Sequence, residues 1–178
     1  SQLLSSELST LLAGRYVEFV IETLSFSEYL DFKDDEEKDI YKSFSQYLKL
    51  GGFPAIHAYN YDVDSAYKIV SDIYSSVILR DTIQRHNIRN VDQLNRIMRF
   101  ILVNIGNLFS AKSISDYFVS QKKKIDVNTV YNYLSALESA YIIRRVNRYN
   151  LKGKEVLKTN EKFYLSDHAL LYALMGYD

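Results

Sequence analysis

Two adjacent segments in the second half of the chain place apolar residues at helical spacing. In the first segment, Ile114, Tyr117 and Phe118 fall on one side of a short helix. Ser110 can cap this helix, whereas Ser115 could cap only its later part, so the pattern leaves the start open by a few residues. The apolar side of such a helix is expected to pack against the element that follows.

A second helix is predicted directly after the polar turn 121–124, which has the sequence QKKK. Asp126 is suited to be its N-cap, because a short carboxylate side chain can accept hydrogen bonds from the free backbone N–H groups. The apolar residues recur three and four positions apart and therefore share one face: Val127, Val130, Leu134, Leu137 and Tyr141. The remaining faces are mostly polar: Asn128, Thr129, Tyr131, Asn132 and Ser135.

A strand and a hairpin are predicted after these two helices. Residues 141–146 alternate and contain β-branched side chains, as a strand does. In residues 151–165, Gly153 can form a turn and residues 163–165 can form the returning strand. Helix, turn, helix, strand and hairpin is the order of a winged helix-turn-helix. We therefore predict a mainly α fold, with a helical-bundle connector followed by a winged helix-turn-helix with a small β-hairpin wing.

The pattern upstream predicts several helices and one strand. Helices are expected in residues 1–13, 39–50, 62–79, 91–105 and 165–175. The apolar stripe of the second of these consists of Ile40, Phe44, Tyr47 and Leu48, and Ser25 and Glu28 have the spacing of a capping box. Residues 15–24 alternate as a strand does, but the neighbouring chain offers no partner strand. The first 24 residues are therefore predicted to be the tail of a domain whose body is missing.

Charge is unevenly distributed along the 178 residues, although the net charge is zero. Residues 1–81 carry seven Lys/Arg and fourteen Asp/Glu, a net charge of −7, whereas residues 121–162 carry ten Lys/Arg and four Asp/Glu, a net charge of +6. The positive excess coincides with the second helix and the wing, which favours an anionic partner. Ordinary solvated surface charge is the alternative interpretation.

No pattern typical of catalysis or metal binding is found. There is no G-x-x-x-x-G-K-[ST] or G-x-S-x-G sequence, and His57, His86 and His168 lack metal-ligand spacing. The chain has no Cys and hence no disulfide, and no apolar run is long enough to span a membrane. We expect a cytoplasmic chain that is not itself an enzyme, holds no metal or cofactor and does not contact a membrane.

Several stretches, taken in chain order, resemble one family. They are LSSE at 4–7, LAGRY at 12–16, LSFSEY at 24–29, LGGFP at 50–54, ILRD at 78–81, NTV at 128–130, YL at 133–134, LESAYII at 137–143 and KFYLSD at 162–167. Together they resemble the prokaryotic AAA-type P-loop ATPases whose C-terminal half has long been called a domain of unknown function. Ala169 departs from the family pattern, which tends to have Gly there.

The resemblance implies a larger parent protein. A nucleotide-binding core with Walker A and Walker B segments would precede this chain, and a nuclease-like α/β domain would follow it. Residues 1–24 would then be a remnant of the ATPase core, residues 25–90 a helical connector and residues 91–178 the winged-helix domain. Both Walker segments are missing from the sequence, so ATP and Mg²⁺ are implied only for the upstream core.

The resemblance also suggests a role for Arg15 in the Leu-Ala-Gly-Arg motif near the end of the implied core. An Arg in that position could reach the γ-phosphate of a nucleotide, including one held by a neighbouring subunit. An ion pair with Glu18 or Glu22 is the simpler alternative. Arg80 and Asp81 are expected to make a structural ion pair or a helix-end contact rather than to catalyse a reaction.

The first functional hypothesis is binding to double-stranded DNA by the winged-helix region. Lysines of the turn, polar residues of the second helix, and cations of the strand and wing would contact the duplex. These residues are Lys122, Lys123, Lys124, Asn128, Thr129, Asn132, Arg145, Arg148, Lys152, Lys154 and Lys158. Arg144 is a further candidate, but Arg144 and Arg145 alternate along a strand and cannot both face one partner.

The second hypothesis is a protein–protein docking module. It would link the ATPase core to the C-terminal nuclease-like domain or to another subunit, and the acidic first half could attract the basic second half. A free-standing enzyme is disfavoured, because no constellation of catalytic residues is present.

Overall fold

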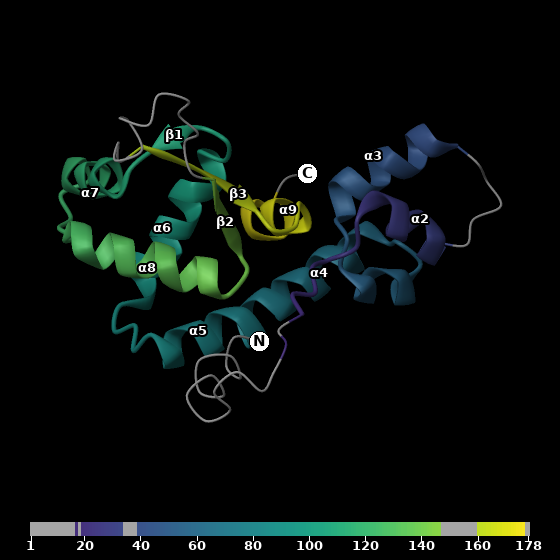
Figure 1. The fold of residues 1–178 in the computed structure, drawn as a ribbon, viewed down its shortest axis with the longest axis horizontal. Coiled ribbons are helices and arrows are strands. Elements are labelled where there is room, and N and C mark those ends of the chain that lie inside the picture. The colour runs from purple at the N-terminus through teal and green to yellow at the C-terminus, as the bar shows by residue number, and fades with distance from the viewer. Residues whose placement is uncertain (1–16, 18, 34–38, 147–159, 177–178) are drawn as a thin grey trace.

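The chain is mainly helical with one small antiparallel sheet (Figure 1). A computed structural model describes residues 17, 19–33, 39–146 and 160–176, with only the backbone of residues 77 and 78. The first part of the described chain forms a group of short helices. A long helical rod leads from this group to the second part, which contains the sheet.

The first part contains α2 (Phe26–Lys33), α3 (Ile40–Leu50) and a 3-10 helix, η1 (Pro54–Tyr59). The predicted capping box is confirmed, since the backbone N–H of Ser25 donates to Glu28 Oε2 at 2.8 Å and the backbone N–H of Glu28 donates to Ser25 Oγ at 3.4 Å. Helix α3 ends at Gly51, whose φ of 76° is in the left-handed region. Aromatic side chains of this part contact one another edge to face or at a tilt, with Tyr29 fully buried among Tyr47, His57 and Tyr61.

The rod consists of α4 (Val63–Ile73), a π-helical segment η2 (Tyr74–Leu79) and α5 (Arg80–Arg85), joined without a break. The predicted helix 62–79 is confirmed at its start, where the Asp62 side chain accepts from the backbone N–H of Ser65. The rod continues to Arg85, six residues beyond the predicted end, because no glycine or proline interrupts it.

The second part runs α6 (Val91–Val103), β1 (Leu108–Phe109), α7 (Ala111–Ser120), α8 (Val127–Ser139), β2 (Ile143–Val146), β3 (Glu161–Leu165) and α9 (Ala169–Met175). The sheet has the order β1-β3-β2, and both pairings are antiparallel. Strand β3 lies in the middle, with Leu108 opposite Lys162 on one side and Arg145 opposite Phe163 on the other.

Both predicted caps in this part are confirmed. The Ser110 side chain accepts from the backbone N–H of Ser113, so α7 begins at the earlier of the two starts that the sequence left open. The Asp126 side chain accepts from the backbone N–H of Asn128 at 2.8 Å and caps α8. Each cap satisfies a backbone donor that the helix itself cannot pair.

Two sequence expectations are wrong in detail. Val17 and residues 19–24 belong to no helix or strand, and the described part of the chain offers this stretch no partner strand. The final helix begins at Ala169 rather than at Leu165, because Leu165 still pairs with Ile143 in the sheet. The expected helix 1–13 and the expected turn at Gly153 lie outside the described residues.

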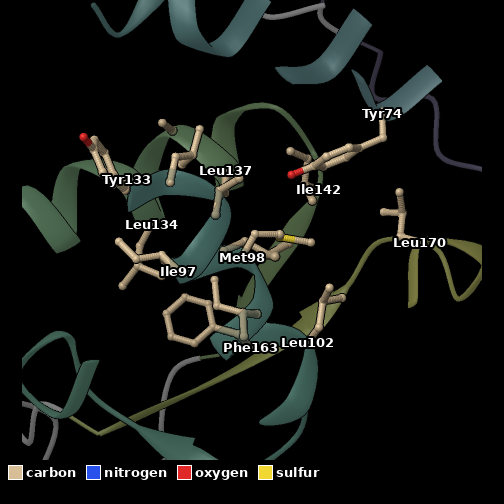
Figure 2. Packing of buried hydrophobic residues seen from close by; sticks show 14 of the residues in the cluster. Tyr74, Ile97, Met98, Leu102, Tyr133, Leu134, Leu137, Ile142, Phe163 and Leu170 are labelled. Carbon is tan, nitrogen blue, oxygen red and sulfur yellow. The ribbon is translucent and has the colours of Figure 1, made fainter. Parts of the chain in front are cut away.

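One continuous apolar core joins the two parts. Figure 2 shows side chains from the π-helical segment, α6, α8, β3 and α9 gathered in it. Helix α9 makes the bridge, since it packs on α4 and α3 as well as on α6. The buried Asp167 carboxylate reinforces this bridge, because Oδ2 accepts from the Gly52 backbone N–H and Oδ1 accepts from the Ala169 backbone N–H, both at 2.9 Å.

Candidate nucleic-acid interface

Helix α8 presents one apolar and one polar face. Its buried residues are Val130, Tyr133, Leu134, Ala136 and Leu137. The side chains of Asn128 and Asn132 are exposed, together with Ser135, while Thr129 is half-buried at the edge of this face. These three exposed positions are four and three residues apart, so they form one polar stripe along the helix. Asparagine amides carry both donors and acceptors, which suits contacts to base edges.

The turn 121–124 is exposed, and only Ile125 and the N-cap Asp126 separate it from α8. It closes α7 through two hydrogen bonds: the Lys123 backbone N–H donates to Phe118 O, and the Lys122 backbone N–H donates to Val119 O, both at 2.9 Å. Lys122 adopts the left-handed conformation with φ of 57°, as the residue after such a helix end does. The three lysines thus lie in the short connection between the end of α7 and the start of α8.

The lysine turn is only weakly engaged by carboxylates of its own chain. Lys123 Nζ lies 3.9 Å from Asp92 Oδ2 on α6, and within the described ranges Lys122 and Lys124 form no ion pair. The Asp92 carboxylate is itself bonded to Arg96 Nε at 2.8 Å. This hydrogen bond, together with the positive charges of Arg96, Lys123 and Arg99, lowers the pKa of Asp92. The turn and the adjoining end of α6 therefore remain net positive.

The two arginines of β2 are both paired with carboxylates. Arg144 is exposed and forms an ion pair with Glu22. Arg145 lies between Glu138 of α8 and Glu161 of β3, with each N–O distance at 3.2 Å, and its guanidinium covers the Phe163 ring. Arg145 thus ties α8 to the sheet, and the structure does not place its guanidinium on the exposed polar stripe of α8.

Several of the expected contacts lie outside the described residues: Arg15, Arg148, Lys152, Lys154 and Lys158. Of the expected set, five residues are exposed in the turn and in the helix α8 that follows it: Lys122, Lys123, Lys124, Asn128 and Asn132. Sequence reasoning missed Arg96 and Arg99 on α6. Helical periodicity could have placed both arginines on the exposed side of α6, because they lie opposite its buried stripe. They were missed because the positive excess was sought only in residues 121–162.

A groove of about 770 Å³ runs beside the lysine turn, between α6, the end of α7 and the end of α9. Cations line part of it, namely Arg96, Arg99 and Lys123. Apolar surface lines the rest and includes Phe100, Val103 and Tyr117. Within the described stretches, Arg99 has an exposed side chain and forms no ion pair, although its charge acts on Asp92.

The described residues offer neither a metal site nor a membrane-spanning helix. No group of three or more His, Asp or Glu side chains there is arranged to hold a metal ion. None of the described helices has both the length and the apolar composition needed to cross a membrane.

Comparison with known proteins places the chain in a family. The sequence is 35% identical over 178 residues to an uncharacterized protein of Haemophilus influenzae, covering 99% of this chain and 44% of that protein. It is 32% identical over 177 residues to an uncharacterized protein of Methanocaldococcus jannaschii, covering 94% of this chain and 39% of that one. The chain thus spans less than half the length of these relatives, and no solved structure matches it significantly. Residues 41–178 match the family described as a domain of unknown function, DUF8612, and the chain belongs to that family.

Proposed function

We propose that residues 91–175 form a winged helix-turn-helix that binds double-stranded DNA, with α8 in the major groove. The element order supports this proposal: α6, β1, α7, α8, β2 and β3 follow one another as helix, strand, helix, helix, strand, strand. Helix α7 packs on α8 and fixes its tilt, while β2 and β3 stand beside the end of α8.

The single observation that carries the proposal is the shared exposure of Asn128, Asn132 and the three lysines in a turn and the helix that follows it. Had the asparagines packed inside, or had the lysines been neutralised by the acidic first half, no cationic polar surface would remain there. Lysine ammonium groups in the turn would contact phosphates and set the register of α8 on the duplex. Asn132, one turn further along, would then reach base edges, with adenine as the preferred base for a bidentate amide.

The salt dependence of DNA binding tests the phosphate contacts. Each contact contributes a slope of about −0.9 to the logarithm of the binding constant against the logarithm of salt concentration. Three lysines would thus contribute about a 40-fold loss of affinity between about 50 and 200 mM salt. Fluorescence anisotropy with a labelled duplex measures it. The Lys124→Gln variant should lower the slope by about 0.9, whereas Lys68→Gln, an exposed lysine on α4, should leave it unchanged.

Base reading is tested separately by Asn132→Ala. On a sequence selected from a random duplex library, the substitution should cost about 1–3 kcal/mol and should leave binding to unrelated duplexes nearly unchanged. Salt-insensitive binding, or no binding to any duplex, contradicts the proposal as a whole. If Asn132→Ala lowers the affinity equally for selected and unrelated duplexes, Asn132 does not read a base, and the proposed phosphate contacts are unaffected by this result.

A docking module is the second candidate, and the pairing of Arg144 and Arg145 with carboxylates favours it. These pairs remove positive charge from the strand that DNA would be expected to meet. In this alternative, the exposed face of α8 contacts the ATPase core, a C-terminal domain or another subunit of the parent protein. Hydrogen exchange would then be slower at the exposed face of α8 in the full-length protein than in this chain, with no DNA present.

The parent protein is proposed to be an AAA-type ATPase on the sequence resemblance alone; the relatives are longer than this chain, which leaves room for further domains in such a parent. This chain would be its non-catalytic part, with ATP and Mg²⁺ bound by an upstream core. Arg15 remains the candidate contact to the γ-phosphate. ATP turnover of full-length Arg15→Ala is the test: a large loss with unchanged thermal stability supports the role, and unchanged turnover rejects it.

A further inference from the structure

Helix α3 leaves most of its apolar stripe uncovered. Ile40 is 59% exposed, Phe44 43% and Leu48 40%, while only Tyr47 of the predicted stripe is half-buried. Tyr41, beside the stripe, is 88% exposed. Exposed apolar residues gathered along one helix of a folded chain are typical of a surface that another protein covers.

The same end of the molecule is acidic. Asp31 of α2 and Asp39 at the start of α3 are exposed, and the connecting sequence between the two helices carries four consecutive carboxylates. From residue 31 to residue 42 the sequence holds six Asp/Glu and three Lys. The exposed apolar stripe of α3 and the exposed carboxylates of Asp31 in α2 and Asp39 at the start of α3 thus belong to two helices. These two helices lie at one end of the molecule (Figure 1).

The groove beside the lysine turn has the complementary composition. Its cationic side holds Arg96, Arg99 and Lys123 against one carboxylate, that of Asp92. Its apolar side includes Val103, 60% exposed, and Tyr117, 48% exposed. The groove lies among α6, α7 and the end of α9, whereas the exposed part of α3 lies at the far end of the elongated molecule (Figure 1). One molecule cannot fill its own groove with its own α3 in this arrangement.

We propose that the α2–α3 end of one copy of this chain docks in the α6–α7 groove of a second copy. Ile40, Tyr41 and Phe44 would cover Val103 and Tyr117, and the carboxylates of Asp31 and Asp39 would face Arg99. The two surfaces are different, so the contact is head-to-tail and can extend into a ring or a filament. Neither Arg99 nor α3 belongs to the proposed DNA-contacting surface, but Lys123 lines the groove and is also a proposed phosphate contact, so self-association is measured without DNA.

The test is sedimentation velocity of the 178-residue chain without DNA, over a range of protein concentrations. The mean mass should rise above the monomer mass of 20.8 kDa with concentration, and the rise should be smaller at about 500 mM than at about 50 mM salt because attraction between exposed charges is screened. Arg99→Glu disables the groove, and the double substitution Ile40→Ser with Tyr41→Ser disables the α3 surface. Each variant alone should remain a monomer, and circular dichroism should show the same thermal stability as the unmodified chain, because all three side chains are exposed.

A mixture of the two variants gives the decisive result. Arg99→Glu retains its α3 surface, and the double variant retains its groove, so one productive contact can form between them. The mixture should reach twice the monomer mass and stop there, since no further contact is available. A wild-type chain that stays monomeric at all concentrations overturns the proposal. So does a mixture that stays monomeric, or two variants that still self-associate separately.

Discussion

Because Lys122 has a left-handed backbone, replacing it with glycine should stabilise the fold while removing a proposed DNA contact. A side chain with a Cβ atom is strained at φ of 57°, whereas glycine is not. We predict that Lys122→Gly raises the free energy of unfolding by up to about 1 kcal/mol while lowering the salt slope of DNA binding by about 0.9. Urea denaturation and fluorescence anisotropy measure the two. A protein that is more stable but binds DNA less tightly cannot owe its loss of binding to unfolding, and unchanged binding would remove Lys122 from the interface.

Gly51 is required for the stability of the fold and not for binding. A Cβ atom there would lie 1.9 Å from Asp167 Oδ1 and 2.8 Å from the Ala169 Cβ, in addition to the strain of φ +76°. We predict that Gly51→Ala lowers the free energy of unfolding by about 2–4 kcal/mol. Gly176→Ala is the matched control, because its φ is +67° and a Cβ there meets nothing within 4 Å. That variant should cost only about 1 kcal/mol. Equal losses in the two variants would mean that contact with Asp167 is unimportant.

At the scale of elements, Arg145 is predicted to hold the end of α8 to the sheet. Arg145→Met leaves Glu138 and the largely buried Glu161 without their cation, and we expect a loss of about 1–3 kcal/mol in the free energy of unfolding. Arg144→Met is the control, because both partners in its pair with Glu22 are exposed and the loss should be below about 1 kcal/mol. Chemical denaturation monitored by circular dichroism compares them. If Arg144→Met proves the more costly, the assignment of roles is reversed.

Local chemistry explains which elements the sequence could predict. Ser110 and Asp126 cap their helices through backbone groups two or three residues away, so the pattern alone was sufficient to predict these helices. Strand β1 was missed because two residues carry no periodicity, and its pairing with β3 depends on residues far downstream. The predicted final helix starts four residues too early, at Leu165, because no neighbouring residue indicates that Leu165 pairs with Ile143 in the sheet.

The candidate site divides in the same way. Helical periodicity correctly placed Asn128 and Asn132 on the outside of α8, because the buried stripe of that helix is local information. Strand alternation showed that Arg144 and Arg145 point to opposite sides, but it could not name Glu22, Glu138 and Glu161 as their partners. The groove could not be predicted from the sequence, since it forms only where α9, which is distant in the chain, packs beside α6 and α7.

At the scale of the whole molecule, α9 determines whether the chain unfolds as one unit. Leu170 of α9 is 1% exposed and belongs to the core shared by the α3–α4 region and the sheet-containing part. We predict that Leu170→Ala costs about 2–5 kcal/mol, as truncation of a buried leucine does. Because both parts share this core, the loss should be felt in α4 and in α8 alike.

Hydrogen exchange measured by mass spectrometry tests this prediction. The most protected amides of α4 and α8 should lose the same free energy of protection in Leu170→Ala, and denaturation should remain a single transition. Leu108→Ala, which shortens a side chain that is 61% exposed on β1, should change neither helix by more than about 0.5 kcal/mol. Loss of protection in α4 alone would mean that the first part unfolds separately. The rod of α4, η2 and α5 would then connect two units that unfold independently.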